Sequence, residues 1–352
     1  MKYPLVSIII INYNGKLLLK NCISSILKNN YLNYEIIVSD NASSDGSIDF
    51  IKKTFISDIS KIKFVKLSKN YGPAFARNQG FKISRGKYIS FLDNDTEVDK
   101  NWILEAVELF TKNSNLGVIQ CKLLLLNQKK RIDYVGEYLG NLGFLKPIGT
   151  YGDVDKGQYD KIYPILAAKS AGMFICRDAF IKAGQFDPDY FIFMEETDLG
   201  WRTWLTGYHN LFCPKSIVYH QFSSTKNIVS KDFNNYLIRF HGTKNYIQTL
   251  VKNLSILNLI KILPIHLFLW ISLGLFLFVN GKFKSSLNIF RGIVWNIINL
   301  PKTLKRRHII QKNRKITDTT LFKTNHLMVK TSLRSYITNF FKSQQNISTP
   351  EN

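Results

Sequence analysis

The chain has 352 residues, of which 45% are hydrophobic, and this is enough to build a full core and argues against wholesale disorder. Its formal net charge is +23, but residues 226–352 hold 20 Lys and Arg against three acids, whereas residues 1–225 hold 28 against 22. The back of the chain is therefore expected to meet an anionic surface. The four cysteines form no CxxC pair, which argues against a structural zinc site and fits a reducing compartment.

The first half of the chain alternates predicted strands with predicted helices. Buried β-branched runs predict strands, which cover residues 5–12, 34–39, 63–67, 87–92 and 118–126. Helical patterns lie between them, over residues 16–27, from residue 47, and over residues 74–84 and 99–111. This alternation predicts an α/β fold with a mostly parallel, Rossmann-like central sheet that is flanked by helices.

Four polar clusters fall where predicted strands end, which is where ligands bind in open α/β sheets. They are Asn12-Tyr13-Asn14, Asp40 to Ser43, Asn70-Tyr71-Gly72 and Asp93-Asn94-Asp95. Any one of them could be a simple turn, because Asp and Asn are common in turns, but their joint placement on one rim indicates a binding site. Paired carboxylates after a strand are suited to Mg²⁺ or Mn²⁺, which would neutralise a diphosphate.

The same segments closely resemble the inverting glycosyltransferase family 2, whose members have the GT-A fold. The matching runs are VSIIIINYNG (residues 6–15), IIVSDNASSDGS (36–47), NYGPAFARNQG (70–80) and FLDNDT (91–96). The acceptor half of that family, above all of its rhamnosyltransferase-like and galactofuranosyltransferase-like members, is similar to SAGMFICRDAF (170–180), FDPDYFIFMEETDLGWR (186–202) and VYHQFSST (218–225). The resemblance implies a GT-A catalytic domain over residues 1–225.

The resemblance also implies a site for a nucleotide-sugar donor at these clusters. Asp40 would hydrogen-bond the base, and Asn12 and Asn14 would line the same pocket. The ribose and the diphosphate would lie against Asn70, Gly72, Arg77 and Asp93. The metal ion, Mn²⁺ or Mg²⁺, would be held by Asp93, Asp95 and His220. Without the resemblance, Arg77 and His220 could equally be surface side chains.

By the same resemblance, Glu196 falls at the position of the general base, where related chains usually carry an Asp. A Glu carboxylate lies about 1.5 Å further from the backbone, and a misplacement of about 1 Å can cost roughly 100-fold in rate. Glu195 and Asp198 therefore remain alternatives for the base. On a helix these two side chains would share a face, and Glu196 would point elsewhere.

The implied reaction is a single displacement that inverts the anomeric configuration and moves a hexosyl or deoxyhexosyl group. The acceptor would be a hydroxyl of a glycan or of a lipid-linked molecule in cell-surface polysaccharide or glycoconjugate synthesis. Two alternatives stay open, namely transfer to a polyprenyl phosphate and an inactive membrane scaffold on the same fold. Nucleic-acid binding is disfavoured, because the basic excess lies beside an apolar run and not among exposed aromatic residues.

Residues 226–315 are predicted to form a helical, apolar and basic region that associates with a membrane. Residues 262–279 carry no formal charge over 18 positions, which is close to the lower limit of about 17–25 residues for a spanning helix. A second apolar stretch covers 287–300, and basic residues surround Lys305-Arg306-Arg307. These features indicate contact with anionic lipids, by a spanning or an in-plane helix.

No signal peptide is recognised at the N-terminus, so the expected location is the cytoplasmic face of the membrane. The alternative for the apolar helix is packing on the catalytic domain or at a homodimer interface. Residues 316–352 are expected to form a loosely ordered basic tail.

Overall fold

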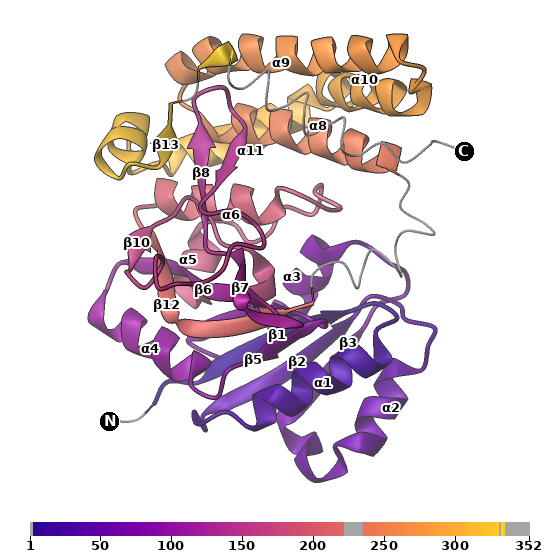
Figure 1. Cartoon of the computed structure of the whole chain (residues 1–352), viewed down its shortest axis with the longest axis vertical. Helices are drawn as coiled ribbons and strands as arrows, with labels where there is room; N and C mark the ends of the chain where they lie inside the picture. The colour runs from indigo at the N-terminus through magenta and orange to yellow at the C-terminus, as the bar shows by residue number, and fades with distance from the viewer. Residues whose placement is uncertain (1–2, 222–234, 331, 335–352) are drawn as a thin grey trace. The chain divides into compact units, whose positions relative to one another are not determined.

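The computed structural model describes residues 3–221, 235–330 and 332–334 (Figure 1). These residues form two compact units. The first unit contains residues 3–137, 147–221 and Asn313–Ile316, and the second contains Tyr138–Lys146, residues 235–312 and the described residues from Thr317 onward. Each unit has its own core and is described by itself.

The first unit is built on a ten-stranded sheet in which eight strands follow the order β10-β12-β6-β11-β4-β1-β2-β3. Its parallel part comprises β1 (Val6–Asn12), β2 (Tyr34–Asp40), β3 (Ile62–Lys66) and β4 (Tyr88–Asp93). These strands match four of the predicted strands to within about one residue at each end, which is closer than the usual uncertainty of such boundaries. The α/β prediction is therefore confirmed.

Beyond β4 the sheet is mixed, which differs from the mostly parallel sheet that was expected. The next strand is β11 (Met173–Cys176), which runs antiparallel to β4 and to β6 (Leu116–Leu125). The structure describes all residues between β6 and β11, and they form no α-helix. A parallel pair normally needs a helical crossover, so the antiparallel pairing of β11 with β6 agrees with this connection. The last long strand, β12 (His209–His220), pairs in parallel with β6.

Short strands complete the sheet, and helices cover both of its faces (Figure 1). The short strands are β5 (Thr96–Val98), β7 (Gln128–Tyr134) and β10 (Tyr163–Pro164). The helices are α1 (Lys16–Leu27), α2 (Ser47–Thr54), η1 (Ile56–Lys61), α3 (Pro73–Ile83), α4 (Trp102–Lys112), η2 (Ser170–Gly172), α5 (Arg177–Lys182) and α6 (Glu195–Leu205). In β1, Ile8 and Ile10 pack in one core cluster and Ile9 in another, as expected for a strand buried on both faces.

The second unit is mainly helical. It contains α8 (Asn235–Asn253), α9 (Ile256–Val279), α10 (Phe283–Ile298) and α11 (Leu300–Lys312). A three-stranded sheet is formed by β8 (Glu137–Gly140), β9 (Leu145–Pro147) and β13 (Met328–Val329). A short π-helical turn, η3 (Thr320–Thr324), and the strand β13 lie beyond residue 316. The segment that was expected to be a loosely ordered tail therefore contains regular structure as far as Val329. Residue 331 and residues 335–352 lie outside the described part.

Among the described residues, α9 is the one helix that is long and apolar enough to cross a membrane, judged by length and composition only. It begins six residues before the predicted stretch of 262–279, and α10 begins four residues before the predicted stretch of 287–300.

Candidate active site

The ends of β1, β2 and β4 bring the polar clusters to one edge of the sheet. In the parallel register, Asn12 lies opposite Asp40, and Ile11 lies opposite Asp93. The side chains at the ends of β1 and β2 are joined directly, because Asn12 Nδ2 donates to Asp40 Oδ1 at 2.9 Å. Asn94 Nδ2 donates to Asn12 Oδ1 at 2.7 Å and links the third strand end to them.

The Asp40 carboxylate organises the loop that follows β2. It is fully buried, and it accepts hydrogen bonds from the Ser43 backbone N–H at 2.9 Å and from the Ser43 hydroxyl at 2.6 Å, besides the bond from Asn12. The Ser43 hydroxyl in turn accepts from the backbone N–H of Asn14 at 2.9 Å, and Asn14 Oδ1 accepts from the Ser44 N–H at 2.8 Å. These five residues are therefore joined in one hydrogen-bond network.

Asn70 and Gly72 form the neighbouring loop, at the entrance to α3. Asn70 Oδ1 accepts from Asn41 Nδ2 at 2.7 Å and from the Gly72 N–H at 2.9 Å. Gly72 has φ +83°, and a Cβ atom there would lie 2.5 Å from the backbone oxygen of Phe191. Only glycine combines that backbone angle with so close an approach. Pro73 then begins the helix, at a position where a missing N–H costs nothing.

Arg77 on α3 is a buried cation among acidic side chains. Its side chain is 3% exposed, and its Nη1 and Nη2 atoms donate to Glu195 Oε1 at 3.1 Å and to Asp93 Oδ1 at 3.0 Å. Glu196 Oε1 lies 4.0 Å from Nη2. Burial by itself acts to lower the pKa of Arg77, but these three carboxylates raise it above its ordinary value. Arg77 is thus a fixed link between the end of β4 and the start of α6, and not a surface side chain.

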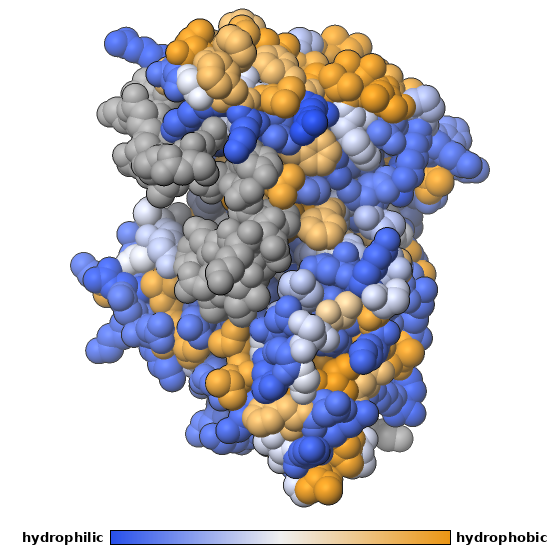
Figure 2. Space-filling model, turned by 90° about the vertical axis from the view of Figure 1, so that its right-hand side faces the viewer, coloured by the Kyte–Doolittle hydropathy of each residue, from blue (hydrophilic) through white to orange (hydrophobic). Residues whose placement is uncertain are grey.

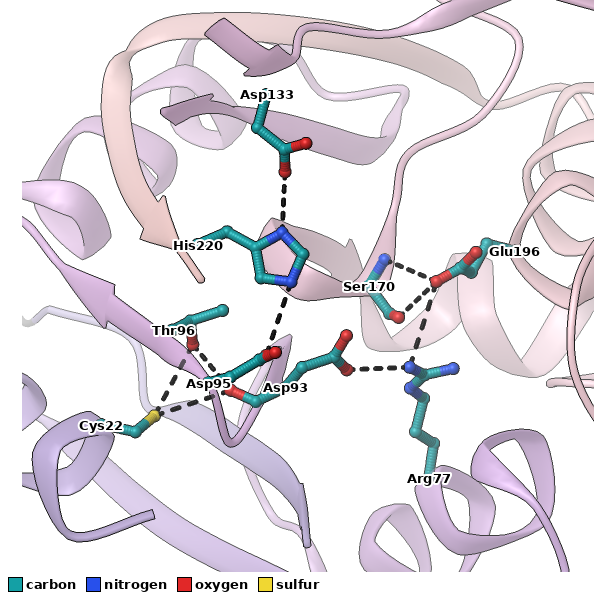
Figure 3. Close-up of polar contacts among 9 residues, drawn as sticks. All are labelled: Cys22, Arg77, Asp93, Asp95, Thr96, Asp133, Ser170, Glu196 and His220. Carbon is teal, nitrogen blue, oxygen red and sulfur yellow. Dashed lines mark hydrogen bonds and ion pairs between the residues drawn. The ribbon is translucent and has the colours of Figure 1, made fainter. Parts of the chain in front are cut away.

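Asp93, Asp95 and His220 form a cluster that could hold a metal ion (Figure 3). One ligand atom from each lies within 4.8 Å of the other two. Asp93 ends β4, and Asp95 immediately precedes β5, which pairs antiparallel with the end of β12 so that Thr96 lies opposite His220. Two carboxylates and one imidazole suit a divalent cation such as Mn²⁺, and carboxylates also suit Mg²⁺.

Asp133 on β7 holds the His220 ring in place (Figure 3). His220 Nδ1 lies 2.7 Å from Asp133 Oδ2, and His220 Nε2 lies 3.4 Å from Asp95 Oδ1. Burial on its own lowers the pKa of His220, but the hydrogen bonds and charges of Asp133 and Asp95 raise it to about 10. A carboxylate on Nδ1 fixes which nitrogen faces the cluster, as in the carboxylate–histidine–metal arrangement of many metal sites.

Thr96 and Cys22 contact the backbone of the turn between β4 and β5. Thr96 Oγ1 donates to the backbone oxygen of Asp93 at 2.7 Å, and the buried Cys22 thiol lies 3.9 Å from the same oxygen (Figure 3). These contacts fix the backbone that carries Asp93 and Asp95.

The three acids of the Glu195–Asp198 segment have different environments. The residues before them, Phe193 and Met194, both have φ +68°, an unfavourable backbone for non-glycine residues that clusters at functional sites. Asp198 is fully buried and is paired with Arg202 at 2.8 Å. Glu195 is buried on Arg77, and its burial and the charge of Glu196 raise its pKa to about 8 against the effect of Arg77.

Glu196 is the most accessible of the three acids, with 22% of its side chain exposed. Its Oε1 atom accepts from the Ser170 N–H at 2.9 Å and from the Ser170 hydroxyl (Figure 3). Within the described part of the chain no hydrogen bond to Glu196 Oε2 is found. The different directions of Glu195 and Glu196 follow from their adjacent positions on the first turn of α6.

Sequence reasoning missed two residues of this site. Asp133 lies in the strand β7, which has four exposed polar positions before its buried end and was not predicted as a strand. Ser170 was included only in a family-like segment and was given no role. The one sequence signal for Asp133 is a carboxylate that directly follows the apolar Ile132, and this signal is too common to identify a partner for His220.

Comparison with known proteins agrees with this arrangement. Residues 7–132 match the model of the family described as Glycosyl transferase family 2. Over these residues, about a third of the chain, the protein is similar to glycosyl transferase family 2. The matched range contains every strand end of the donor-side rim, with Asn12, Asp40, Asn70, Asp93 and Asp95.

Two curated bacterial relatives illustrate the similarity. The putative teichuronic acid biosynthesis glycosyltransferase TuaG of Bacillus subtilis (strain 168) is 32% identical over 111 residues, which are 32% of this chain and 44% of TuaG. The UDP-Glc:alpha-D-GlcNAc-diphosphoundecaprenol beta-1,3-glucosyltransferase WfaP of Escherichia coli is 42% identical over 93 residues, which are 26% of this chain and 35% of WfaP. The chain spans at most 60% of the length of the first curated relatives it matches.

A solved structure supports the fold over most of the chain. The mannosyltransferase PcManGT from Pyrobaculum calidifontis, in complex with GDP-Man and Mn²⁺, aligns with a TM-score of 0.52 at 13% identity and covers 89% of this chain and 86% of that one. The fold is GT-A, as the sequence indicated.

Proposed function

We propose that the protein is a metal-dependent, inverting glycosyltransferase of cell-surface polysaccharide or glycoconjugate synthesis. It would move a hexosyl or deoxyhexosyl group from a nucleotide-diphosphate sugar to a hydroxyl of a glycan or lipid-linked acceptor. The observation that carries this proposal is the cluster of Asp93, Asp95 and His220, placed at the strand ends beside Arg77 and Glu196. The names of TuaG and WfaP support the substrate class.

On the donor side, the nucleotide would lie along the rim formed by the ends of β1 and β2. Asp40 has one carboxylate lone pair left after its three hydrogen bonds, on Oδ2, and this is the proposed acceptor for a base N–H. Asn12 and Asn14 would shape the same pocket. Asn70 and Gly72 would face the ribose, since their loop lies at the end of the next strand.

A divalent cation, Mn²⁺ or Mg²⁺, held by Asp93, Asp95 and His220 would supply charge neutralisation for the departing diphosphate. Asp93 would also contact the ribose. Arg77 would keep the Asp93 carboxylate in position through its 3.0 Å hydrogen bond, and it has no freedom to swing away because it is buried and also bound to Glu195.

Glu196 is the proposed general base. Ser170 holds its Oε1 atom, so Oε2 is the atom that would take the proton of the acceptor hydroxyl. The acceptor oxygen would then attack the anomeric carbon from the side opposite the diphosphate, which inverts the configuration in one step. Asp198 and Glu195 are weaker alternatives for the base. Asp198 is fully buried in an ion pair with Arg202, and Glu195 is buried in an ion pair with Arg77.

A panel of nucleotide sugars in a thermal-shift assay, with and without Mn²⁺, tests the donor side. We expect one diphosphate sugar to raise the melting temperature only when the metal is present. The variant Asp95→Asn should lose this shift, whereas the surface variant His308→Ala should keep it. Stabilisation by all the sugars without metal would contradict the proposed site.

Transfer to a polyprenyl phosphate is the second candidate within the same site. Such an acceptor is already an anion and needs no strong base, so full activity of Glu196→Gln would favour it, and a loss of about 10²–10⁴-fold would favour a hydroxyl acceptor. An inactive scaffold on the same fold predicts no metal-dependent nucleotide binding at all.

We also propose that residues 1–225 catalyse the transfer and that residues 226–315 associate with anionic lipids at the cytoplasmic face of a membrane. The apolar α9 and the diphosphoundecaprenol in the name of WfaP support this location. A homodimer remains the competing use of the same apolar surface.

A further inference from the structure

Helix α9 is apolar on two opposite faces, and the residues that the structure describes cover one of them. The covered face packs in the core of the second unit with residues of α8, α10 and the hairpin between β8 and β9. Its buried positions recur at helical spacing, and they are Ile262, His266, Leu269, Trp270, Leu273, Gly274 and Leu277. This stripe makes α9 a structural part of the unit.

Polar contacts fix the covered face more firmly than apolar packing alone. His266 is fully buried; its Nδ1 lies 3.0 Å from the Leu142 backbone oxygen, and its Nε2 accepts from the Trp270 indole N–H at 3.0 Å. The Ser286 hydroxyl of α10 donates to the Gly274 backbone oxygen at 2.8 Å. If α9 left the unit to span a bilayer by itself, His266 Nδ1 would lose the Leu142 oxygen and the Ser286 hydroxyl would lose the Gly274 oxygen, whereas the bond from Trp270 to His266 lies within α9 and would stay.

The opposite face of α9 is an exposed apolar stripe. It runs through Leu257, Ile260, Phe268, Ile271, Leu275 and Phe278, whose exposed fractions range from 40% to 69%. The neighbouring α10 adds a second exposed row with Phe283, Leu287, Val294 and Ile298. Apolar side chains gather over these two helices at the upper edge of Figure 2. We call the surface formed by these exposed side chains of α9 and α10 the apolar plate.

The charges around the apolar plate are mostly positive; the one acid that contacts α9 in the described part of the chain is the buried Asp318, which accepts from Ser255 N–H and Asn258 Nδ2 at the start of the helix. Residues 235–317 contain 14 Lys and Arg and neither Asp nor Glu. Exposed cations lie on the two helices themselves, at Lys261, Lys284 and Arg291. Arg291 lies in the middle of α10, which is a costly place for a charge if that helix crossed a bilayer core beside α9. At the headgroup level its long side chain can reach the lipid phosphates.

We propose that the apolar plate lies flat in the surface of an anionic lipid bilayer, so that α9 is an in-plane helix and does not span it. The plate would sink about 5–10 Å, to the boundary of headgroups and acyl chains. The excess of positive charge favours this occupant over a second copy of the chain, because two such surfaces would repel each other. The proposal rests on the proposed association of residues 226–315 with anionic lipids, but not on the proposed catalysis, whose thermal-shift test uses no lipid.

Vesicle flotation of the full chain tests the choice of occupant. We expect tight, salt-sensitive binding to phosphatidylcholine vesicles that contain about one-third phosphatidylglycerol, and weak binding to phosphatidylcholine alone. The triple variant Lys261→Gln/Lys284→Gln/Arg291→Gln should lose about fivefold per residue on the anionic vesicles. A folded protein that floats with neither vesicle, or that forms a dimer through this surface in solution, would overturn the proposal.

A matched pair of apolar variants tests the plate itself. Leu257→Ser/Phe268→Ser/Leu275→Ser should weaken binding at least about tenfold per side chain. The control removes three exposed apolar side chains from the first unit, Leu17→Ser/Leu32→Ser/Ile56→Ser, and should bind vesicles like the unchanged protein. Circular dichroism verifies that both variants are folded. Equal vesicle binding by the two variants would refute the assignment of this surface.

Labelling of the two ends of α9 separates in-plane from spanning geometry. Lys261 and Lys282 flank the apolar stretch and are 21 residues apart, which corresponds to about 30 Å along a helix, close to the thickness of a bilayer core. Lys261→Cys and Lys282→Cys would each be placed in a Cys176→Ser background, because the other cysteines are buried. In inverted membrane vesicles, an impermeant maleimide should label both ends. Labelling at one end only, or at neither, would overturn the in-plane arrangement.

Discussion

The pairing of Asp133 with His220 leads to a prediction about metal affinity. Asp133→Asn keeps the shape of the side chain but replaces the charged oxygen that lies 2.7 Å from His220 Nδ1. The loss of such an orienting partner typically lowers metal affinity about 10–100-fold, which equals about 1.4–2.7 kcal/mol. Asp133 is not one of the three clustered ligands and contacts His220 Nδ1, so its effect is expected to act through the imidazole.

Titration of Mn²⁺, followed by the electron paramagnetic resonance signal of the free ion, measures this affinity without any substrate. In a His220→Ala background, Asp133→Asn should have almost no further effect, because the residue through which it acts is gone. Asp155→Asn is a control for loss of a carboxylate in the same unit, since Asp155 pairs with Lys122 and does not contact His220. If Asp133→Asn lowered affinity equally in both backgrounds, an orienting role would be refuted.

Three further predictions concern stability. Arg77→Met should lower the free energy of unfolding by about 3–5 kcal/mol in urea denaturation, because buried carboxylates lose their partner; a change below about 1 kcal/mol would contradict this. Gly72→Ala should destabilise by about 1–3 kcal/mol because of φ +83° and the nearby Phe191 oxygen, whereas Gly242→Ala, which has open space in α8, should not. Burial raises the pKa of Glu35, but hydrogen bonds, above all from Lys63, bring it below its ordinary value of 4.5. The free energy of unfolding should therefore decrease as the pH is lowered below about 4.5, and it should decrease less in Glu35→Gln.

The sequence predicted best what depends on local patterns. The strands β1, β2 and β4 are continuous β-branched or apolar runs that end in Asn or Asp, so their bounds and their shared rim could be predicted from residue types alone. The antiparallel entry of β11 could not, because a four-residue strand has no period that tells parallel from antiparallel pairing.

The candidate site shows the same division between local and long-range information. The spacing of Asp93 and Asp95 indicated a metal site, but the contact of His220 with Asp133 joins residues 87 positions apart in sequence. The pairing of Arg77 with Glu195 spans 118 positions. Such contacts are decided by how the strands and helices pack, so one sequence gave no signal for them, and Arg77 was judged equally able to lie on the surface.

The variant Glu196→Asp tests whether the longer side chain is needed at the position where related chains carry an Asp. Ser170 holds the Oε1 atom of Glu196 through its N–H at 2.9 Å and its hydroxyl, so the longer side chain is fixed at its far end. Glu196→Asp withdraws the carboxylate by about 1.5 Å, which breaks both hydrogen bonds, and should lower kcat roughly 100-fold although it restores the usual residue. The KM for the donor should not change, because no donor-side residue is altered, and Glu108→Asp on the exposed face of α4 should leave both constants unchanged. Full activity of Glu196→Asp would mean that the local backbone, and not the Ser170 contact, determines where the base lies.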